Sequence, residues 1–336
     1  MDKENLTLKQ KIMQMFICGF TDDNYRTNKY LFEMLQNGLG GIIFFSHNIK
    51  SDIQFKRLIE DLNKDSAIPL FLSIDQEGGR VERTEKIHAG KKYLSAKYAY
   101  EMGLSFLQNQ TKEIALELKQ YGLNMNFAPV LDVNTNNNNP IIGERAFSSN
   151  TDEVINASKV VLKEYGKYGI IAVGKHFPGH GASSIDSHKA LPVINLSYEE
   201  LYSIHIKPFK AAIDIGIPAI MVAHVFYSTL EKDNIPSSLS KKIITDLLIN
   251  KLNFNGVIIS DDMEMNAVKN FSRLDACIQG INAGITMFIF RNTTKDIYEL
   301  IEGIEQAVKN GIIKEDIIDI AIDKIYNLKY HYGIIR

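Results

Sequence analysis

The sequence lacks the features that mark disulfide-stabilised, membrane-spanning or nucleic-acid-binding proteins. Its 336 residues include only two cysteines, Cys18 and Cys277, too few for a disulfide framework in a chain of this length. The apolar patch at residues 12–20 is short and contains Gln14, so it predicts neither a signal peptide nor a membrane span. The net charge is −2 and the lysines are interleaved with acids, which leaves no basic surface for nucleic acid. We therefore expect a cytoplasmic protein with no nucleic-acid or membrane partner.

Apolar segments of strand length recur along the chain and alternate with amphipathic helical stretches such as residues 157–169 and 313–333. Continuous apolar runs are typical of parallel strands that helices cover on both faces, and the alternation indicates βαβ units. No GxGxxG motif follows the first strand, which disfavours a doubly wound sheet that binds a dinucleotide. The sequence therefore predicts an α/β fold, a (β/α)8 TIM barrel, with residues 1–336 in a single domain. The eight predicted strands are residues 14–20, 40–45, 69–75, 124–130, 169–175, 217–224, 255–261 and 284–290.

Polar residues follow several of these strands, at the end of the barrel where TIM-barrel enzymes carry their catalytic groups. Lys175 is the hardest of them to explain as a surface residue, because a charge directly after an apolar strand is costly to bury without an anionic or hydroxyl-rich partner. Ordinary structural roles fit others: His224 as a hydrogen-bonded core residue, and Glu77 with Arg80 as a surface pair. The candidate site residues from this set are Asp75, Arg83, Arg145, Lys175, His176 and Asp261.

Asp186 and His188 stand two residues apart in a loop rich in glycine and serine. In a locally extended backbone their side chains would lie on the same side, so that the carboxylate orients the imidazole and stabilises its protonated form. Asp261, held at a strand end, would then be the nucleophile of a retaining glycosidase, with the side chain of Asp262 pointing elsewhere. The alternative is that the Asp-Ser-His sequence only caps a turn.

Two other classes of function draw on the same residues. A metal-dependent hydrolase could take ligands from the histidines and Asp261, but no HxH motif follows the first strand and no helix carries HExxH, so we expect no metal. A non-catalytic carbohydrate-binding barrel would need the sugar-binding groups but neither Asp261 nor the Asp186–His188 pair. The joint presence of all three residues favours an enzyme.

Four segments closely resemble those of the family 3 glycoside hydrolases, in particular the bacterial β-N-acetylglucosaminidases. They are IDQEGGRVER (74–83), IGERAF (142–147), KHFPGHGASSIDSH (175–188) and SDDMEM (260–265). The resemblance implies that Asp261 is the nucleophile of a retaining reaction and that His188 is the acid/base, with Asp186 as its dyad partner. It also implies that no cofactor is used and that the sugar hydroxyls and acetamido group are held by Asp75, Arg83, Arg145, Lys175 and His176.

The same resemblance implies a substrate: terminal β-linked N-acetylglucosamine (GlcNAc) on cell-wall muropeptide fragments, within peptidoglycan recycling. A β-glucosidase or β-xylosidase on the same scaffold, and a GlcNAc phosphorylase that transfers the sugar to phosphate, stay open as alternatives. Many family 3 β-glucosidases carry a second α/β domain, and its absence from this chain fits the glucosaminidase subgroup. We expect a monomer. Residues 134–139, the asparagine run, have no counterpart in these motifs.

Overall fold

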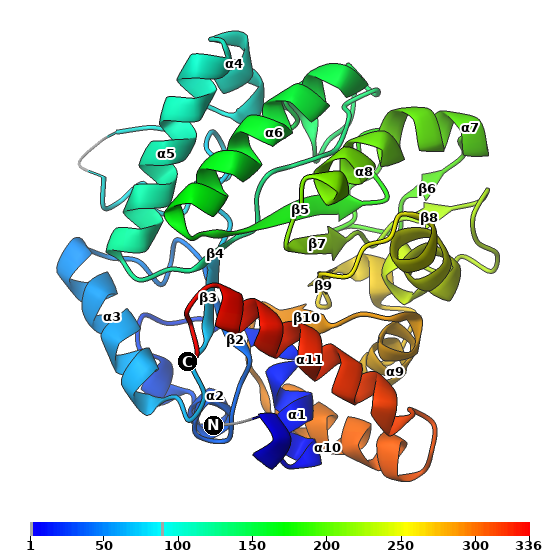
Figure 1. Ribbon diagram of the computed structural model, residues 1–336. Helices are drawn as coiled ribbons and strands as arrows, with labels where there is room; N and C mark the ends of the chain where they lie inside the picture. Colours follow the sequence, from blue (N-terminus) through cyan, green and yellow to red (C-terminus); the bar gives the residue numbers. More distant parts are fainter. Residues whose placement is uncertain (1–2, 89–90) are drawn as a thin grey trace.

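Eight parallel strands close into a barrel in the part of the chain that the structure, a computed structural model, describes: residues 3–88 and 91–336 (Figure 1). Around the barrel the strands follow the order β1-β10-β9-β7-β5-β4-β3-β2, and β2 pairs with β1 to close the ring. The strands are β1 (Phe16–Cys18), β2 (Gly41–Phe44), β3 (Phe71–Ile74), β4 (Met125–Asn126), β5 (Ile171–Phe177), β7 (Ala219–Val222), β9 (Val257–Asp262) and β10 (Met287–Phe290).

The predicted barrel is confirmed, because each of the eight predicted segments overlaps one of these strands. β9 runs one residue past its predicted end, to Asp262, and β4 and β5 differ from the prediction by more. β4 is limited to two residues, with a single further bridge between Val130 and Lys175, and Pro129 in between has no N–H to donate to the ladder. β5 continues past the predicted end at residue 175 to Phe177, so His176 is a strand residue as well as Lys175.

Helices surround the barrel, and a small parallel sheet of β6 (Val193–Ile194) and β8 (Phe226–Tyr227) lies outside it. The α-helices are α1 (Leu8–Gln14), α2 (Lys29–Gln36), α3 (Asp52–Asp65), α4 (Ala96–Glu101), α5 (Leu104–Gln120), α6 (Thr151–Tyr168), α7 (Tyr198–Glu200), α8 (Lys207–Asp214), α9 (Arg273–Ala283), α10 (Lys295–Lys309) and α11 (Glu315–His331). π-Helical turns form η4 (Leu201–Ile206) and η6 (Lys242–Lys251). Short 3₁₀ turns form η1 (Lys3–Asn5), η2 (Tyr25–Thr27), η3 (Gly143–Arg145), η5 (Ser237–Leu239) and η7 (Asn266–Val268).

Local sequence sets where these helices begin and end, as α6 illustrates. The side chain of Asn150 accepts hydrogen bonds from the N–H groups of Asp152 and Glu153, which the first helical turn leaves without partners. At the other end Gly169 adopts φ 72°, a left-handed conformation that glycine takes without a Cβ clash. The helix bounds are therefore fixed by residues that flank the apolar stripe.

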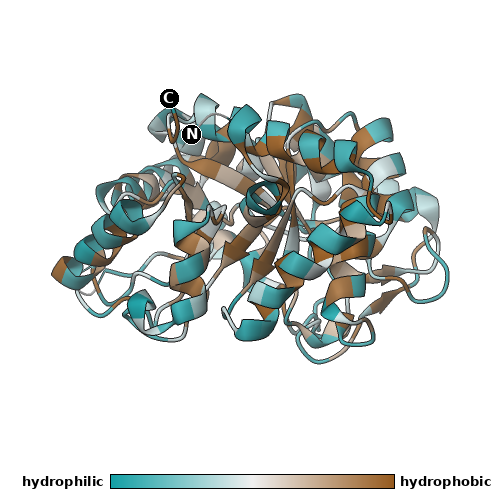
Figure 2. Ribbon diagram, turned by 90° about the horizontal axis from the view of Figure 1, so that it is seen from below, coloured by the Kyte–Doolittle hydropathy of each residue, from teal (hydrophilic) through white to brown (hydrophobic). Residues whose placement is uncertain are grey.

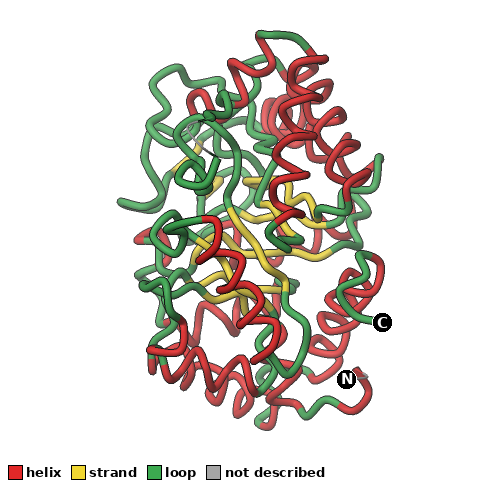
Figure 3. The backbone as a smooth tube through the Cα atoms, turned by 90° about the vertical axis from the view of Figure 1, so that its left-hand side faces the viewer, coloured by secondary structure: helices red, strands yellow, loops and turns green. Residues whose placement is uncertain are grey.

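The hydropathy pattern follows the layers, with apolar strands at the centre and polar faces on the outer helices (Figure 2). Loops gather at the end of the barrel opposite the two termini (Figure 3). No helix in the two described ranges is long and apolar enough to cross a bilayer.

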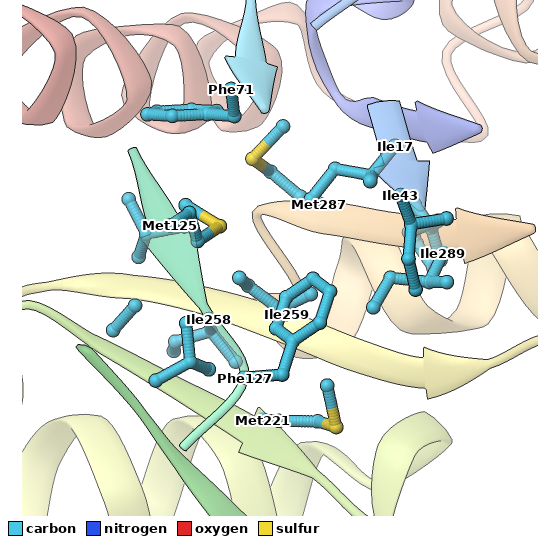
Figure 4. Packing of buried hydrophobic residues seen from close by; sticks show 14 of the residues in the cluster. Ile17, Ile43, Phe71, Met125, Phe127, Met221, Ile258, Ile259, Met287 and Ile289 are labelled. Atoms are coloured by element: carbon cyan, nitrogen blue, oxygen red, sulfur yellow. The ribbon is translucent and has the colours of Figure 1, made fainter. Parts of the chain in front are cut away.

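Side chains from strands around the whole ring fill the inside of the barrel (Figure 4). Phe71, Met125 and Met287 are completely buried there. A further group of interior residues also lines a cavity at the loop end of the barrel, so the core itself provides the apolar floor of that cavity; the group is Ile43, Phe127, Met221 and Ile289.

Lys329, on α11, is completely buried near the amino ends of the strands. Its ammonium donates to Gln14 Oε1 at 2.8 Å and to the carbonyl oxygen of Pro69 at 2.6 Å, and it lies 5.0 Å from the ring centre of Phe71. These partners carry no formal negative charge. Burial therefore lowers the pKa of Lys329 from 10.5 to about 7.

This lowered pKa predicts how stability depends on pH. Between pH 7 and about 10 the unfolded chain binds a proton at Lys329 that the folded chain has released, so stability rises with pH in this window. From pH 7 to pH 9, we expect the free energy of unfolding to increase by about 2 kcal/mol more in the wild type than in Lys329→Met. Urea denaturation of both proteins at the two pH values measures this, and parallel pH profiles would contradict it.

Candidate active site

A cavity of about 370 Å³ opens at the carboxyl ends of the barrel strands. Seven of the eight predicted site residues line it, and the eighth, Asp186, is hydrogen-bonded to one of those seven. The seven are Asp75, Arg83, Arg145, Lys175, His176, His188 and Asp261. The prediction that these strand ends converge on one opening is therefore confirmed, while their chemical roles stay predictions.

Lys175 is 1% exposed and its ammonium is held between two carboxylates. Nζ lies 2.7 Å from Asp75 Oδ1 and 2.6 Å from Glu77 Oε1. Both acids follow β3, whereas the lysine is on β5, so the pair of contacts spans the intervening strand β4. We expected an anionic or hydroxyl-rich partner for a buried lysine at this position, and the structure provides two anionic ones.

The interpretation of Glu77 and Arg80 as a surface pair is wrong. The side chain of Glu77 is 3% exposed and accepts two hydrogen bonds of 2.8 Å from the guanidinium of Arg145, in addition to the contact with Lys175. Burial alone would raise the pKa of Glu77, but the charges of Arg145 and Lys175 hold it well below its ordinary value. Arg80 instead donates to the carbonyl oxygen of Ile142 at 3.2 Å.

Asp132 is a buried residue of the site that the sequence analysis missed. Its Oδ2 lies 2.7 Å from Nδ1 of His176, and its Oδ1 accepts the backbone N–H of His180 at 2.6 Å. Burial raises the pKa of Asp132, and the interaction with His176 more than reverses this. Like Asp75 and Asp261, Asp132 directly follows an apolar segment at a strand exit, and that signal could have identified it.

Arg83 and Asp75 form a second, more open part of the cavity. Arg83 Nη2 lies 3.9 Å from Asp75 Oδ2, and its guanidinium lies 5.7 Å from the ring centre of Phe45. Nε of Arg83 is buried without a hydrogen-bond partner among the described residues. This N–H and the free positions on Asp75 can bind hydroxyl or carbonyl oxygens of a ligand.

Asp261 lies at the end of β9 with its carboxylate in the cavity. Burial raises the pKa of Asp261. The imidazoles of His176 and His224 and the backbone N–H of Asp262 lower it by a larger amount, so that the resulting pKa is about 2. Asp261 is therefore an anion at neutral pH. The adjacent Asp262 pairs with Arg291. Both of these residues also line the cavity, so the prediction that only Asp261 faces it is wrong.

Asp186 and His188 are in contact, but not through the extended backbone that we predicted. The residues form a turn in which Lys189 N donates to the carbonyl oxygen of Asp186 at 2.9 Å. Oδ1 of Asp186 accepts the backbone N–H of His188 at 2.9 Å and lies 2.8 Å from its Nδ1. The turn-capping role and the dyad role are thus compatible, and the side chain of His188 is 48% exposed, with Nε2 directed away from the carboxylate.

His224 has the structural role that we expected. It is completely buried, with Nδ1 2.6 Å from Ser238 Oγ and Nε2 3.1 Å from the carbonyl oxygen of Asp262. Burial lowers its pKa. In residues 3–88 and 91–336 no three His, Cys, Asp or Glu side chains are grouped so that they could hold a metal ion.

The closed barrel carries an anionic aspartate, a histidine–aspartate pair and several hydrogen-bonding charges at its carboxyl end, the place where barrel enzymes hold groups for nucleophilic and acid–base chemistry. Comparisons with known proteins agree. The model of the glycosyl hydrolase family 3 N-terminal domain matches residues 7–328. A β-hexosaminidase of Haemophilus influenzae is 30% identical over 323 residues, which cover 89% of this chain and 90% of that protein. The chain belongs to glycosyl hydrolase family 3.

Solved structures support the same family. A family 3 β-N-acetylglucosaminidase from Paenibacillus sp. str. FPU-7 superposes with a TM-score of 0.92 at 32% identity, covering 98% of this chain and 63% of that chain. β-Hexosaminidase A of Pseudoalteromonas piscicida is 30% identical over 87% of this chain, which spans 53% of that protein. The chain thus corresponds to about half of some relatives and to nearly all of others, and the predicted resemblance to the β-hexosaminidases of this family is confirmed.

The shared carboxylate of Glu77 leads to a prediction for Glu77→Gln. The amide cannot neutralise Lys175 and Arg145, so both cations are left with less negative charge in a buried site. We expect the free energy of unfolding to fall by about 3 kcal/mol, measured by urea denaturation. The control is Glu144→Gln. Glu144 is next to Arg145 in the chain, but Arg145 pairs with Glu77, and Glu144 forms no ion pair with the described residues. Equal stability of the two variants would contradict the role of Glu77.

Proposed function

We propose that the protein is a retaining exo-β-N-acetylglucosaminidase in which Asp261 is the nucleophile and His188, oriented by Asp186, is the acid/base. The observation that carries this proposal is that the anionic Asp261 and the imidazole of His188 line the same cavity.

The first step transfers the sugar to the protein. An oxygen of Asp261 attacks the anomeric carbon and forms a covalent bond to it, while the bond from that carbon to the leaving-group oxygen breaks. His188 gives its Nε2 proton to the leaving oxygen, and Asp186 stabilises the imidazolium beforehand through Nδ1. The lowered pKa of Asp261 keeps the attacking oxygen ionised over the neutral pH range.

The second step restores the protein. Neutral His188 takes a proton from a water molecule, whose oxygen attacks the anomeric carbon, and the bond to Asp261 breaks. Two inversions at the same carbon give retention. Because His188 is uncharged when it acts as base, it does not repel an anionic acceptor, so transfer to phosphate is a second candidate outcome of this step.

The remaining cavity residues are proposed to bind the sugar. Asp75 and Lys175 present charges to hydroxyl groups, and Arg83 has an unpaired Nε–H for a ligand oxygen. Arg145 and His176, 3.4 Å apart, form the wall to which we assign the acetamido group. A volume of about 370 Å³ is at the small end of ligand cavities, which suits one terminal sugar with the aglycone outside.

The natural substrate that we propose is a β-linked GlcNAc terminus on a cell-wall muropeptide fragment, in the cytoplasm. The relatives named β-hexosaminidase support the GlcNAc part of this proposal. We also propose that the chain acts as a monomer.

Substrate choice is tested with para-nitrophenyl β-GlcNAc, β-glucoside and β-xyloside. We expect kcat/KM for the GlcNAc substrate to exceed the other two at least about a hundredfold, because a site that is built to hydrogen-bond an amide leaves buried polar groups unpaired without it. Preference for glucose or xylose would overturn the acetamido assignment, and no turnover of any of them would favour a binding protein. Detection of GlcNAc 1-phosphate when phosphate is added would identify phosphorolysis.

The catalytic assignment is tested by the leaving-group dependence of variants. Asp261→Ala should lose activity on all substrates, on the order of 10⁴-fold or more, because no covalent intermediate can form. His188→Ala should lower kcat/KM for methyl β-GlcNAc about a hundredfold or more but change that for the para-nitrophenyl substrate little, since a good leaving group needs no proton. Equal losses on both substrates would contradict the donor role of His188.

A further inference from the structure

The asparagine run lies against the beginning of the acid/base loop, residues 179–190. Nδ2 of Asn139 donates to the carbonyl oxygen of His180 at 2.8 Å. Nδ2 of Asn136 donates to the carbonyl oxygen of Ser183 at 2.9 Å. Two side-chain amides of the run therefore hold two carbonyl groups of the loop.

The backbones of the two segments are also in direct contact. The N–H of Asn136 donates to the carbonyl oxygen of Gly181 at 3.2 Å. A Cβ atom added to Gly181 would lie 1.8 Å from the carbonyl oxygen of Val133, so this position has room only for glycine. The loop thus begins on a surface that the segment 133–139 provides.

The side chain of His180 connects the part of the loop that contacts the asparagine run with the part that carries Asp186 and His188. Nε2 of His180 lies 3.1 Å from Oγ of Ser187, the residue between the two members of the dyad, and both residues are 1% exposed. Burial lowers the pKa of His180 to about 4, which keeps the ring neutral at physiological pH. The position of His180 therefore bears on the position of His188.

Asn139 also reaches the sugar-binding wall. Its Oδ1 accepts hydrogen bonds from the N–H groups of Ile141 at 3.0 Å and Ile142 at 2.8 Å. The carbonyl oxygen of Ile141 in turn accepts from Nη1 of Arg145 at 3.1 Å. One amide is thus shared between the acid/base loop and the guanidinium in the cavity.

We propose that Asn136 and Asn139 are positioning residues that set where His188 stands relative to the bound sugar. Asp132 and Tyr227 also hold the first residues of the loop, through the backbone N–H of His180 and the carbonyl oxygen of Gly179. Beyond Ser183, residues 184 and 185 and His188 itself are exposed. This inference rests on the proposed function, because it assigns the run to the acid/base group named there. The run itself contacts no reacting atom in this assignment.

The test uses Asn136→Asp, Asn139→Asp and the double variant. Aspartate is close to asparagine in shape and keeps the acceptor oxygens that Asn138, Ile141 and Ile142 use, but it removes the N–H donated to the loop. We expect kcat/KM for methyl β-GlcNAc to fall about tenfold in each single variant, while kcat/KM for the para-nitrophenyl substrate stays within about twofold. In the double variant, the loss of kcat/KM for methyl β-GlcNAc should approach the loss in His188→Ala.

Asn138→Asp is the matched control. Asn138 is exposed, and its side chain makes no hydrogen bond to the described part of the chain, so this variant adds the same charge to the same run without removing a contact. Thermal unfolding of each variant verifies that the barrel is folded. If the double variant does not fold, the two single variants are compared with the control.

The outcomes separate this inference from the proposed function. Losses on the poor leaving group in Asn136→Asp and Asn139→Asp, absent from Asn138→Asp, support it. Equal losses on both substrates, or values that match the control, overturn it. A His188→Ala variant without leaving-group dependence would instead overturn the proposed function, whatever the asparagine variants do.

Discussion

The candidate site depends on one buried ammonium group, that of Lys175, enclosed by the carboxylates of Asp75 and Glu77. A charge in this position is tolerated only when it is paired and hydrogen-bonded. Both carboxylate oxygens of Glu77 also accept hydrogen bonds from Arg145. The network thus has two cations and two anions, and removing any one of the four leaves the others with an unbalanced charge. The network joins the ends of β3 and β5 across β4, so these charged groups of the cavity are held by the barrel itself.

The two groups assigned to catalysis are supported differently. Asp261 is part of a strand, and its carboxylate lies above the apolar floor formed by the barrel core, where electrostatic interactions are stronger than in water. His188 is on an exposed turn whose connection to the barrel runs through His180 and the asparagine run. This arrangement combines a fixed nucleophile with a proton donor on a surface loop, from which local movement requires less unfolding than from a strand.

Much of this site could be anticipated from the sequence, for identifiable reasons. Continuous apolar segments predict buried parallel strands, and in a barrel the residues after those strands must meet at one end. The energetic argument about Lys175 correctly required anionic partners. It did not identify Glu77, because a Glu followed by two glycines and an arginine has the composition of a surface turn, and its true partners are 68 and 98 positions further along the chain.

The sequence by itself determined the strands, their polar ends and the identity of the motif residues, because periodicity and local composition depend on neighbours in the chain. Only the tertiary structure decided which charges pair, that Asp132 supports His176, that Asp186 and His188 meet in a turn, and that the asparagine run lies under the acid/base loop. The contacts of Lys175 with Asp75 and Glu77, of Glu77 with Arg145, of Asp132 with His176 and of Asn139 with His180 each join residues more than forty positions apart. Such contacts exist only once the barrel has closed and brought the ends of its strands together.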